Sequence, residues 1–192
     1  MHGFANPKRF LSLARWLTPL LLVGGLVLAG GALLWGFFVV PPDRLMGETV
    51  RILFLHVPTA WLGMGGWSAI ALSSLVYLVW RHPLAYIALA QAAEREGVSP
   101  RIPAIFGLLG AVNIPIINRS VVWWNSLHQP PSITAGGSSI DAAFLVPLMV
   151  AVLGFSLLFG AIVLMRMRTL LADAQAEARL RRKAMDAGGD LR

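Results

Sequence analysis

The chain has no cysteine among its 192 residues, so it cannot form a disulfide, a thiolate metal site or a thioether link to haem. Charged residues are also scarce. They make up 13% of the chain, against about a quarter of a soluble domain. Their distribution leaves four long runs without Asp, Glu, Lys or Arg: Leu17 to Val40, Ile52 to Trp80, Ile102 to Asn118 and Ala142 to Met165.

These four runs predict membrane-spanning helices, because about 20 apolar residues are needed to cross a hydrocarbon core of roughly 30 Å. Three runs are long enough as they stand. The third reaches that length if it continues to Trp124 and Arg119 extends its charged group to the interface. The sequence therefore predicts an all-α polytopic membrane bundle of about four transmembrane helices, at 17–40, 54–80, 102–124 and 142–165.

Two further expectations concern individual spans. The first has a basic lead, as a signal peptide has, but its apolar run is too long for a cleaved signal, so we expect it to be retained. The second is rich in Gly, Ala and Ser, which let neighbouring backbones approach closely, so we expect it to be buried in the bundle.

The net charge of +7 is a topology signal. Of the 16 basic residues, 13 fall in the segments on one side of the predicted membrane, and only Arg44, Arg51 and Arg119 fall on the other. The richer side is expected to be cytoplasmic, which places both termini in the cytoplasm. The charge gives no reason to expect nucleic acid as a partner. Residues 1–168 are then a transmembrane domain and 169–192 a basic cytoplasmic helical tail.

Two histidines are expected at the other, outer face. His56 lies just inside the outer end of the second span, and His128 follows the outer end of the third. Two such imidazoles could ligate a haem iron from opposite sides, with Trp61, Trp123 and Trp124 offering flat apolar surface to the ring. Simple interfacial anchoring is the alternative for the two histidines and for the pair Trp123 and Trp124.

Other chemistries find little support in the sequence. There is no Gly-rich phosphate loop, no obvious grouping of Ser, His and an acid, and no Asp or Glu within a predicted span, as an ion-coupled transporter would usually need. His2 and His82 are expected at the surface, His82 on the cytoplasmic side. Two alternatives stay open. One is a b-type electron-transfer subunit, which usually needs histidine pairs at more than one depth. The other is a non-haem structural or permease subunit of an ABC-type complex.

Two stretches of the sequence are similar to a known family. Residues 51–58 read Arg-Ile-Leu-Phe-Leu-His-Val-Pro, and residues 120–130 read Ser-Val-Val-Trp-Trp-Asn-Ser-Leu-His-Gln-Pro. Both resemble the haem exporter protein C family of cytochrome c maturation (CcmC). Together with Gly110 to Ile117 and shorter stretches, the resemblance covers most of residues 16–83 and 107–168.

The resemblance implies a non-enzymatic, multi-pass protein of the bacterial inner membrane. Such proteins hold haem b transiently and non-covalently at the periplasmic face and pass it to a periplasmic haem chaperone. They work beside ABC-transporter subunits and a small membrane protein. His56 and His128 match the family's two axial haem ligands.

The chain also departs from the family's pattern. Family members usually have six spans, and two of them are joined by a periplasmic segment that ends in Trp-Trp-x-Trp-Asp and supports the haem. Here only residues 84–106 occupy the corresponding gap, and that pattern appears nowhere in the sequence. Because the difference is two helices, the other spans keep their expected orientation.

Overall fold

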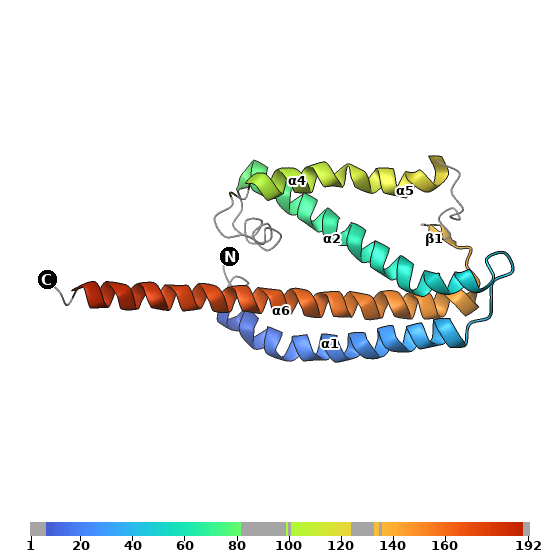
Figure 1. The fold of residues 1–192 in the computed structure, drawn as a ribbon, viewed down its shortest axis with the longest axis horizontal. Coiled ribbons are helices and arrows are strands. Elements are labelled where there is room, and N and C mark those ends of the chain that lie inside the picture. The colour runs from blue at the N-terminus through green and yellow to red at the C-terminus, as the bar shows by residue number, and fades with distance from the viewer. Residues whose placement is uncertain (1–6, 82–98, 100, 124–132, 135, 190–192) are drawn as a thin grey trace.

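The computed structural model describes residues 7–81, 99, 101–123, 133–134 and 136–189, and they form an elongated helical bundle (Figure 1). The helices are α1 (Pro7–Phe38), the short 3-10 helix η2 (Glu48–Ile52), α2 (Leu53–Trp80), α4 (Arg101–Ala111), α5 (Asn113–Trp123) and α6 (Ala142–Gly189). Two-residue strands β1 (Ile133–Thr134) and β2 (Gly137–Ser138) form an antiparallel hairpin before α6.

The predicted fold class is confirmed. Four helical segments are long and apolar enough to cross a membrane: Arg9–Phe38, Glu48–Trp80, Arg101–Ser120 and Ala142–Met185. The chain is therefore an all-α multi-pass membrane protein. The placement of both termini in the cytoplasm stays a prediction.

The tightest packing joins α1 and α6, which run antiparallel side by side (Figure 1). Small residues make this approach possible: Gly25, Ala29 and Ala32 of α1 are buried, and so is Gly154 of α6. A Cβ added at Gly154 would lie 2.3 Å from the backbone nitrogen of Ala29. In lipid, where apolar burial alone does not drive association, such close backbone contact is a main source of helix packing energy.

Helix α2 crosses this pair diagonally, with its beginning near α6 and its end near α4 (Figure 1). The ring of Trp67 packs over Gly110, where an added Cβ would lie 2.1 Å from the indole. Its indole nitrogen donates a hydrogen bond of 3.2 Å to the carbonyl of Gly107. These two glycines on one face of α4 therefore form the surface on which Trp67 of α2 packs.

The expectation that the second span is buried is wrong for the described part of the chain. Only 6% of the apolar window of α2 is buried, against 22% for α1 and for α6. A Cβ added at Gly63 or Gly65 would meet nothing within 4 Å. Small residues permit close approach but supply no partner. Helix α2 contacts α6 with its first part and α4 with its second part, instead of running along one helix.

The third predicted span is divided into α4 and α5, with a turn at Val112. Pro115 explains the division. It has no N–H to donate to the carbonyl of Ala111, and its ring would clash with that carbonyl in a continuous helix. The two segments still count as one candidate span.

The last helix, α6, is 48 residues long. At about 1.5 Å per residue it extends about 72 Å, more than twice the thickness of a hydrocarbon core. About half of it must therefore lie outside the membrane, in agreement with a helical tail. The domain boundary after residue 168 stays a prediction.

Candidate functional site

The beginning of α2 is fixed against the α1–α6 pair by an apolar cluster. Phe54 is fully buried and packs with Val40 and Leu148. Gly36 of α1 leaves room for its ring, since a Cβ added there would lie 2.3 Å from it. Pro58, one turn further along α2, is buried as well. One face of the first turns of α2 is thus committed to the core.

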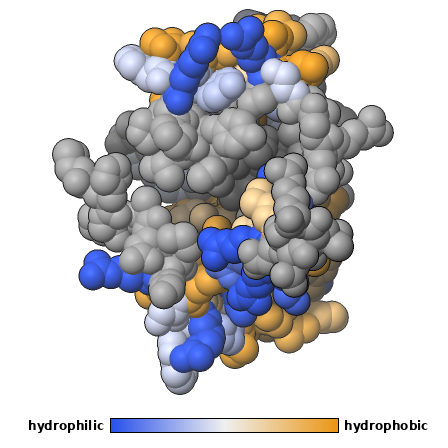
Figure 2. Space-filling view, turned by 90° about the vertical axis from the view of Figure 1, so that its left-hand side faces the viewer, coloured by the Kyte–Doolittle hydropathy of each residue, from blue (hydrophilic) through white to orange (hydrophobic). Residues whose placement is uncertain are grey.

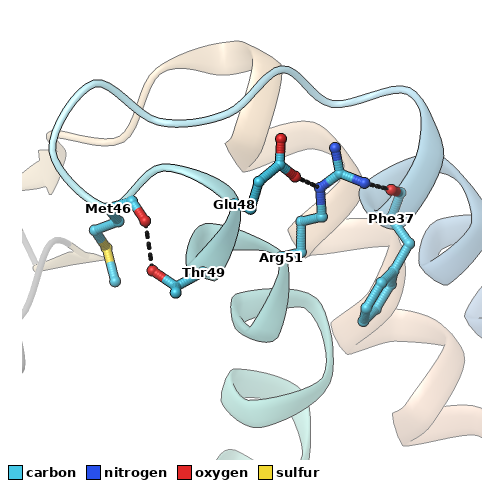
Figure 3. A network of polar contacts seen from close by, with 5 residues as sticks. All are labelled: Phe37, Met46, Glu48, Thr49 and Arg51. Atoms are coloured by element: carbon cyan, nitrogen blue, oxygen red, sulfur yellow. Dashed lines mark hydrogen bonds and ion pairs between the residues drawn. The ribbon is translucent and has the colours of Figure 1, made fainter.

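Arg51 of η2, just before α2, is bonded to the end of α1 (Figure 3). The guanidinium of Arg51 donates a hydrogen bond to the carbonyl of Phe37, and its Nε lies 2.6 Å from a carboxylate oxygen of Glu48. The last carbonyls of a helix have no partner within the helix and carry partial negative charge, so an arginine is well suited to this place. Arg51 therefore helps to set the position of residues 53–56.

Replacing Arg51 with methionine should lower the free energy of unfolding by about 1–2 kcal/mol, because a charged hydrogen bond to a helix end is lost. Arg44→Met is the matched control, since Arg44 is exposed in the same connection. Thermal unfolding in detergent measures both. Equal loss in the two variants would contradict the role given to Arg51.

The connection between α1 and η2 is closed by an Asp43 turn. Its carboxylate accepts hydrogen bonds from the backbone nitrogens of Leu45, at 2.8 Å, and Met46, at 2.9 Å. These bonds favour the charged form and lower the pKa of Asp43 below its ordinary value of 3.8. The stabilisation that the charged Asp43 gives to the folded protein is therefore present above pH 3.8 and is lost as the pH falls through the lowered pKa.

His56 lies in the first turns of α2 and is exposed. It follows the buried Phe54 by two positions, which is about 200° around a helix, so it faces away from the core. The same face continues through Thr59 and Gly63, both exposed. Nothing lies within 4 Å of the place where Gly63 would carry a Cβ, so there is open space on this face at Gly63. Gly63 was not predicted as part of the site, although its spacing of seven from His56 was the available signal.

The structure separates the predicted tryptophans. Trp61 is 52% exposed, but it lies five positions after His56, about 140° around α2, and so belongs to a different face. Trp123, 60% exposed, is the last residue of α5.

His128 and Trp124 lie outside the described residues. The described elements on either side of them, the end of α5 and β1, lie at the same end of the molecule as the beginning of α2 (Figure 1). Within the described part of the chain, no three His, Asp or Glu side chains are grouped as a metal site would need. Joint ligation by His56 and His128 stays a prediction.

Comparison with known proteins decides the family. A sequence profile described as Heme exporter protein C matches residues 1–93 and 84–182. The chain is 35% identical to the Heme exporter protein C of Bradyrhizobium diazoefficiens, over 85% of this chain and 82% of that one. The chain belongs to the haem exporter protein C family. Relatives of the same name from Escherichia coli K12 and Paracoccus denitrificans are 29% and 26% identical, over 89% and 94% of this chain and 90% and 97% of their own.

The comparisons also locate a deficit in this member of the haem exporter protein C family. The alignment with the Bradyrhizobium protein runs over 217 positions but includes 85% of these 192 residues, about 163, so about 54 positions have no residue here. The alignment with the Paracoccus protein runs over 234 positions and includes 94% of this chain, about 180, which again leaves about 54. The two profile matches meet at residues 84–93. The deficit therefore falls between α2 and α4.

Proposed function

We propose that this protein takes part in haem export for cytochrome c maturation. It holds haem b at the periplasmic face of the bacterial inner membrane and releases it to a periplasmic haem chaperone. Membership of the haem exporter protein C family supports the role in haem export. Haem is the cargo here, bound non-covalently, and the protein acts as a carrier and not as an enzyme.

The observation that carries the proposal is the placement of His56 on an open face beside a fixed helix start. The core around Phe54 and the contact of Arg51 with Phe37 hold the beginning of α2 in place. The face through Thr59 and Gly63 lets a flat ring approach the helix backbone below the imidazole. We assign His56 and His128 as axial ligands of the haem iron, with Trp123, Trp124 and Trp61 in its surroundings.

The deficit between α2 and α4 is compatible with this role. The end of α2 and the beginning of α4 lie at the same end of the molecule (Figure 1). Any segment inserted between them must therefore cross the membrane an even number of times. About 54 positions are enough for two crossings of about 20 residues and a connection. The beginning of α2 and the end of α5 therefore lie on the same side of the membrane as they would in a longer relative.

Gly63 and Gly65 offer a matched pair of variants. Both are helical glycines with nothing within 4 Å of an added Cβ, so leucine at either place should fit. They point about 160° apart, and only Gly63 shares the face of His56. Gly63→Leu should weaken haem binding about tenfold by crowding the ring, and Gly65→Leu should leave the affinity unchanged.

Titration of the detergent-solubilised protein with haem measures this difference. Equal affinities of the two leucine variants would show that the ring does not lie on the Gly63 face.

Export itself is tested in cells that lack their own haem exporter protein C. The chain is produced with the haem chaperone, the ABC-transporter subunits and the small membrane protein of the maturation system. Haem should appear on the chaperone when the chain is present and should be lost with His56→Ala. Haem on this chain but none on the chaperone would contradict the transfer step and leave the holding step standing.

A further inference from the structure

An open pocket of about 400 Å³ lies at the opposite end of the molecule from His56. It is lined by Leu11, Ser12 and Arg15 of α1 and by Arg168 of α6. The start of α1 and the middle of α6 meet there (Figure 1). The proposed haem function uses none of these residues.

The pocket is strongly cationic. Two guanidinium groups from two helices line it, and within the described residues neither forms an ion pair with a carboxylate. Helix α1 contains no acidic residue, and the first acid on α6 after Arg168 is Asp173. Figure 2 looks onto this end of the molecule, where hydrophilic residues lie in several separate groups beside apolar surface.

The depth of the pocket matches the headgroup region of a bilayer. Arg15 comes two positions before the charge-free run that starts at Leu17, and Arg168 comes three positions after the run that ends at Met165. Both guanidiniums therefore lie at the border of the hydrocarbon core. Trp16, 73% exposed, lies at the same level, where tryptophan is common.

An apolar strip leads from the pocket towards the middle of the membrane. Pro19, Val23 and Leu26 follow Ser12 and Arg15 along one face of α1 at helical spacing. All three are exposed, Val23 to 60% and Leu26 to 57%. The arrangement offers cations for a headgroup and an apolar track for an acyl chain.

We propose that Arg15 and Arg168 bind the phosphate headgroup of an anionic phospholipid, with an acyl chain along Pro19, Val23 and Leu26. Arginine recognises phosphate through paired N–H donors, and basic pockets between transmembrane helices are suited to anionic headgroups. A lipid held by one arginine from each helix would join α1 to α6 at the end of the molecule opposite to the contacts of η2 and Phe54.

The test compares two double variants that remove the same charge. Arg15→Gln with Arg168→Gln removes the proposed site, and Arg179→Gln with Arg182→Gln removes two exposed arginines of the tail. Each protein is purified in a non-ionic detergent and titrated with phosphatidylglycerol, and the shift of its thermal midpoint is measured. A gain of about 1 kcal/mol for each arginine corresponds to about fivefold in affinity, so the site variant should bind about 30-fold more weakly and the tail variant as the wild type does.

Three results would overturn the proposal. They are equal weakening in the two double variants, an equal response to phosphatidylcholine, and a full response to millimolar inorganic phosphate, which would indicate a site for a soluble anion. If the site variant does not fold, the single variant Arg15→Gln, whose side chain is exposed, should still show about fivefold weaker binding, and an unchanged affinity would contradict the assignment.

Discussion

Replacing His56 with alanine should reduce the haem that copurifies with the protein to less than about a tenth of the wild-type amount. Changes to groups that merely support a metal ligand already cost 10–100-fold in affinity, and His56 is proposed as a ligand itself. The side chain is exposed and outside the core around Phe54, so the fold should be kept. The measurement is the haem content per protein after purification in detergent.

His82→Ala is the matched control for this result. It makes the same substitution at a histidine that is expected on the cytoplasmic side. His128→Ala should behave as His56→Ala does, if both imidazoles bind one iron. Haem retained in full by both His56→Ala and His128→Ala would remove the ligand assignments.

Replacing Gly25 with valine should abolish the folded protein or lower its stability by about 3 kcal/mol. A Cβ at Gly25 would lie 2.8 Å from the backbone nitrogen of Leu158 and 3.0 Å from the carbonyl oxygen of Gly154. These are backbone atoms, which cannot turn away as a flexible side chain can, so α1 and α6 must separate. Size-exclusion chromatography and thermal unfolding in detergent measure the effect.

Gly31→Val is its control in the same helix. A Cβ added at Gly31 would meet nothing within 4 Å, and the residue is exposed. Its variant should therefore fold and unfold as the wild type does. Similar damage from both substitutions would mean that valine disturbs α1 itself and that the close contact with α6 is not the cause.

The spans could be predicted from the sequence because the bilayer imposes a simple rule on charge. A run without ionised groups and long enough to cross is read directly from the sequence, and each of the four runs largely coincides with one candidate span. The division of the third span was not predicted, although Pro115 carried the signal for it. A proline near the start of a helix is tolerated, and one in the interior is not, so its effect depends on where the helix begins.

The pairing of the helices was harder to predict. Both α1 and α2 contain several glycines and alanines, and the close contact was predicted for α2. The structure gives it to α1, where Gly25, Ala29 and Ala32 repeat at spacings of four and three on one face, and Gly25 and Ala29 lie against Gly154. In α2 the exposed Gly63 and Gly65 fall on different faces. Composition alone does not distinguish these cases, but the spacing does.

The candidate site could be predicted only in part. His56 is exposed because it lies two positions after the buried Phe54. The sequence alone does not show that Phe54 is on the buried face, so this exposure could not be predicted. The separation of Trp61 from His56 by about 140° follows from helix geometry and could have been predicted. For Trp61 to contact a haem that His56 binds, the haem ring must extend across two faces of α2.

The most direct test of the central claim is the absorption and electron paramagnetic resonance spectrum of the wild-type chain purified with haem. Two axial imidazoles should give six-coordinate, low-spin iron, at about one haem per protein, and His56→Ala should convert what remains to a high-spin form. A wild-type protein that carries no haem, or haem whose spectrum is the same with and without His56, would contradict the claim that this shortened chain holds haem between its histidines.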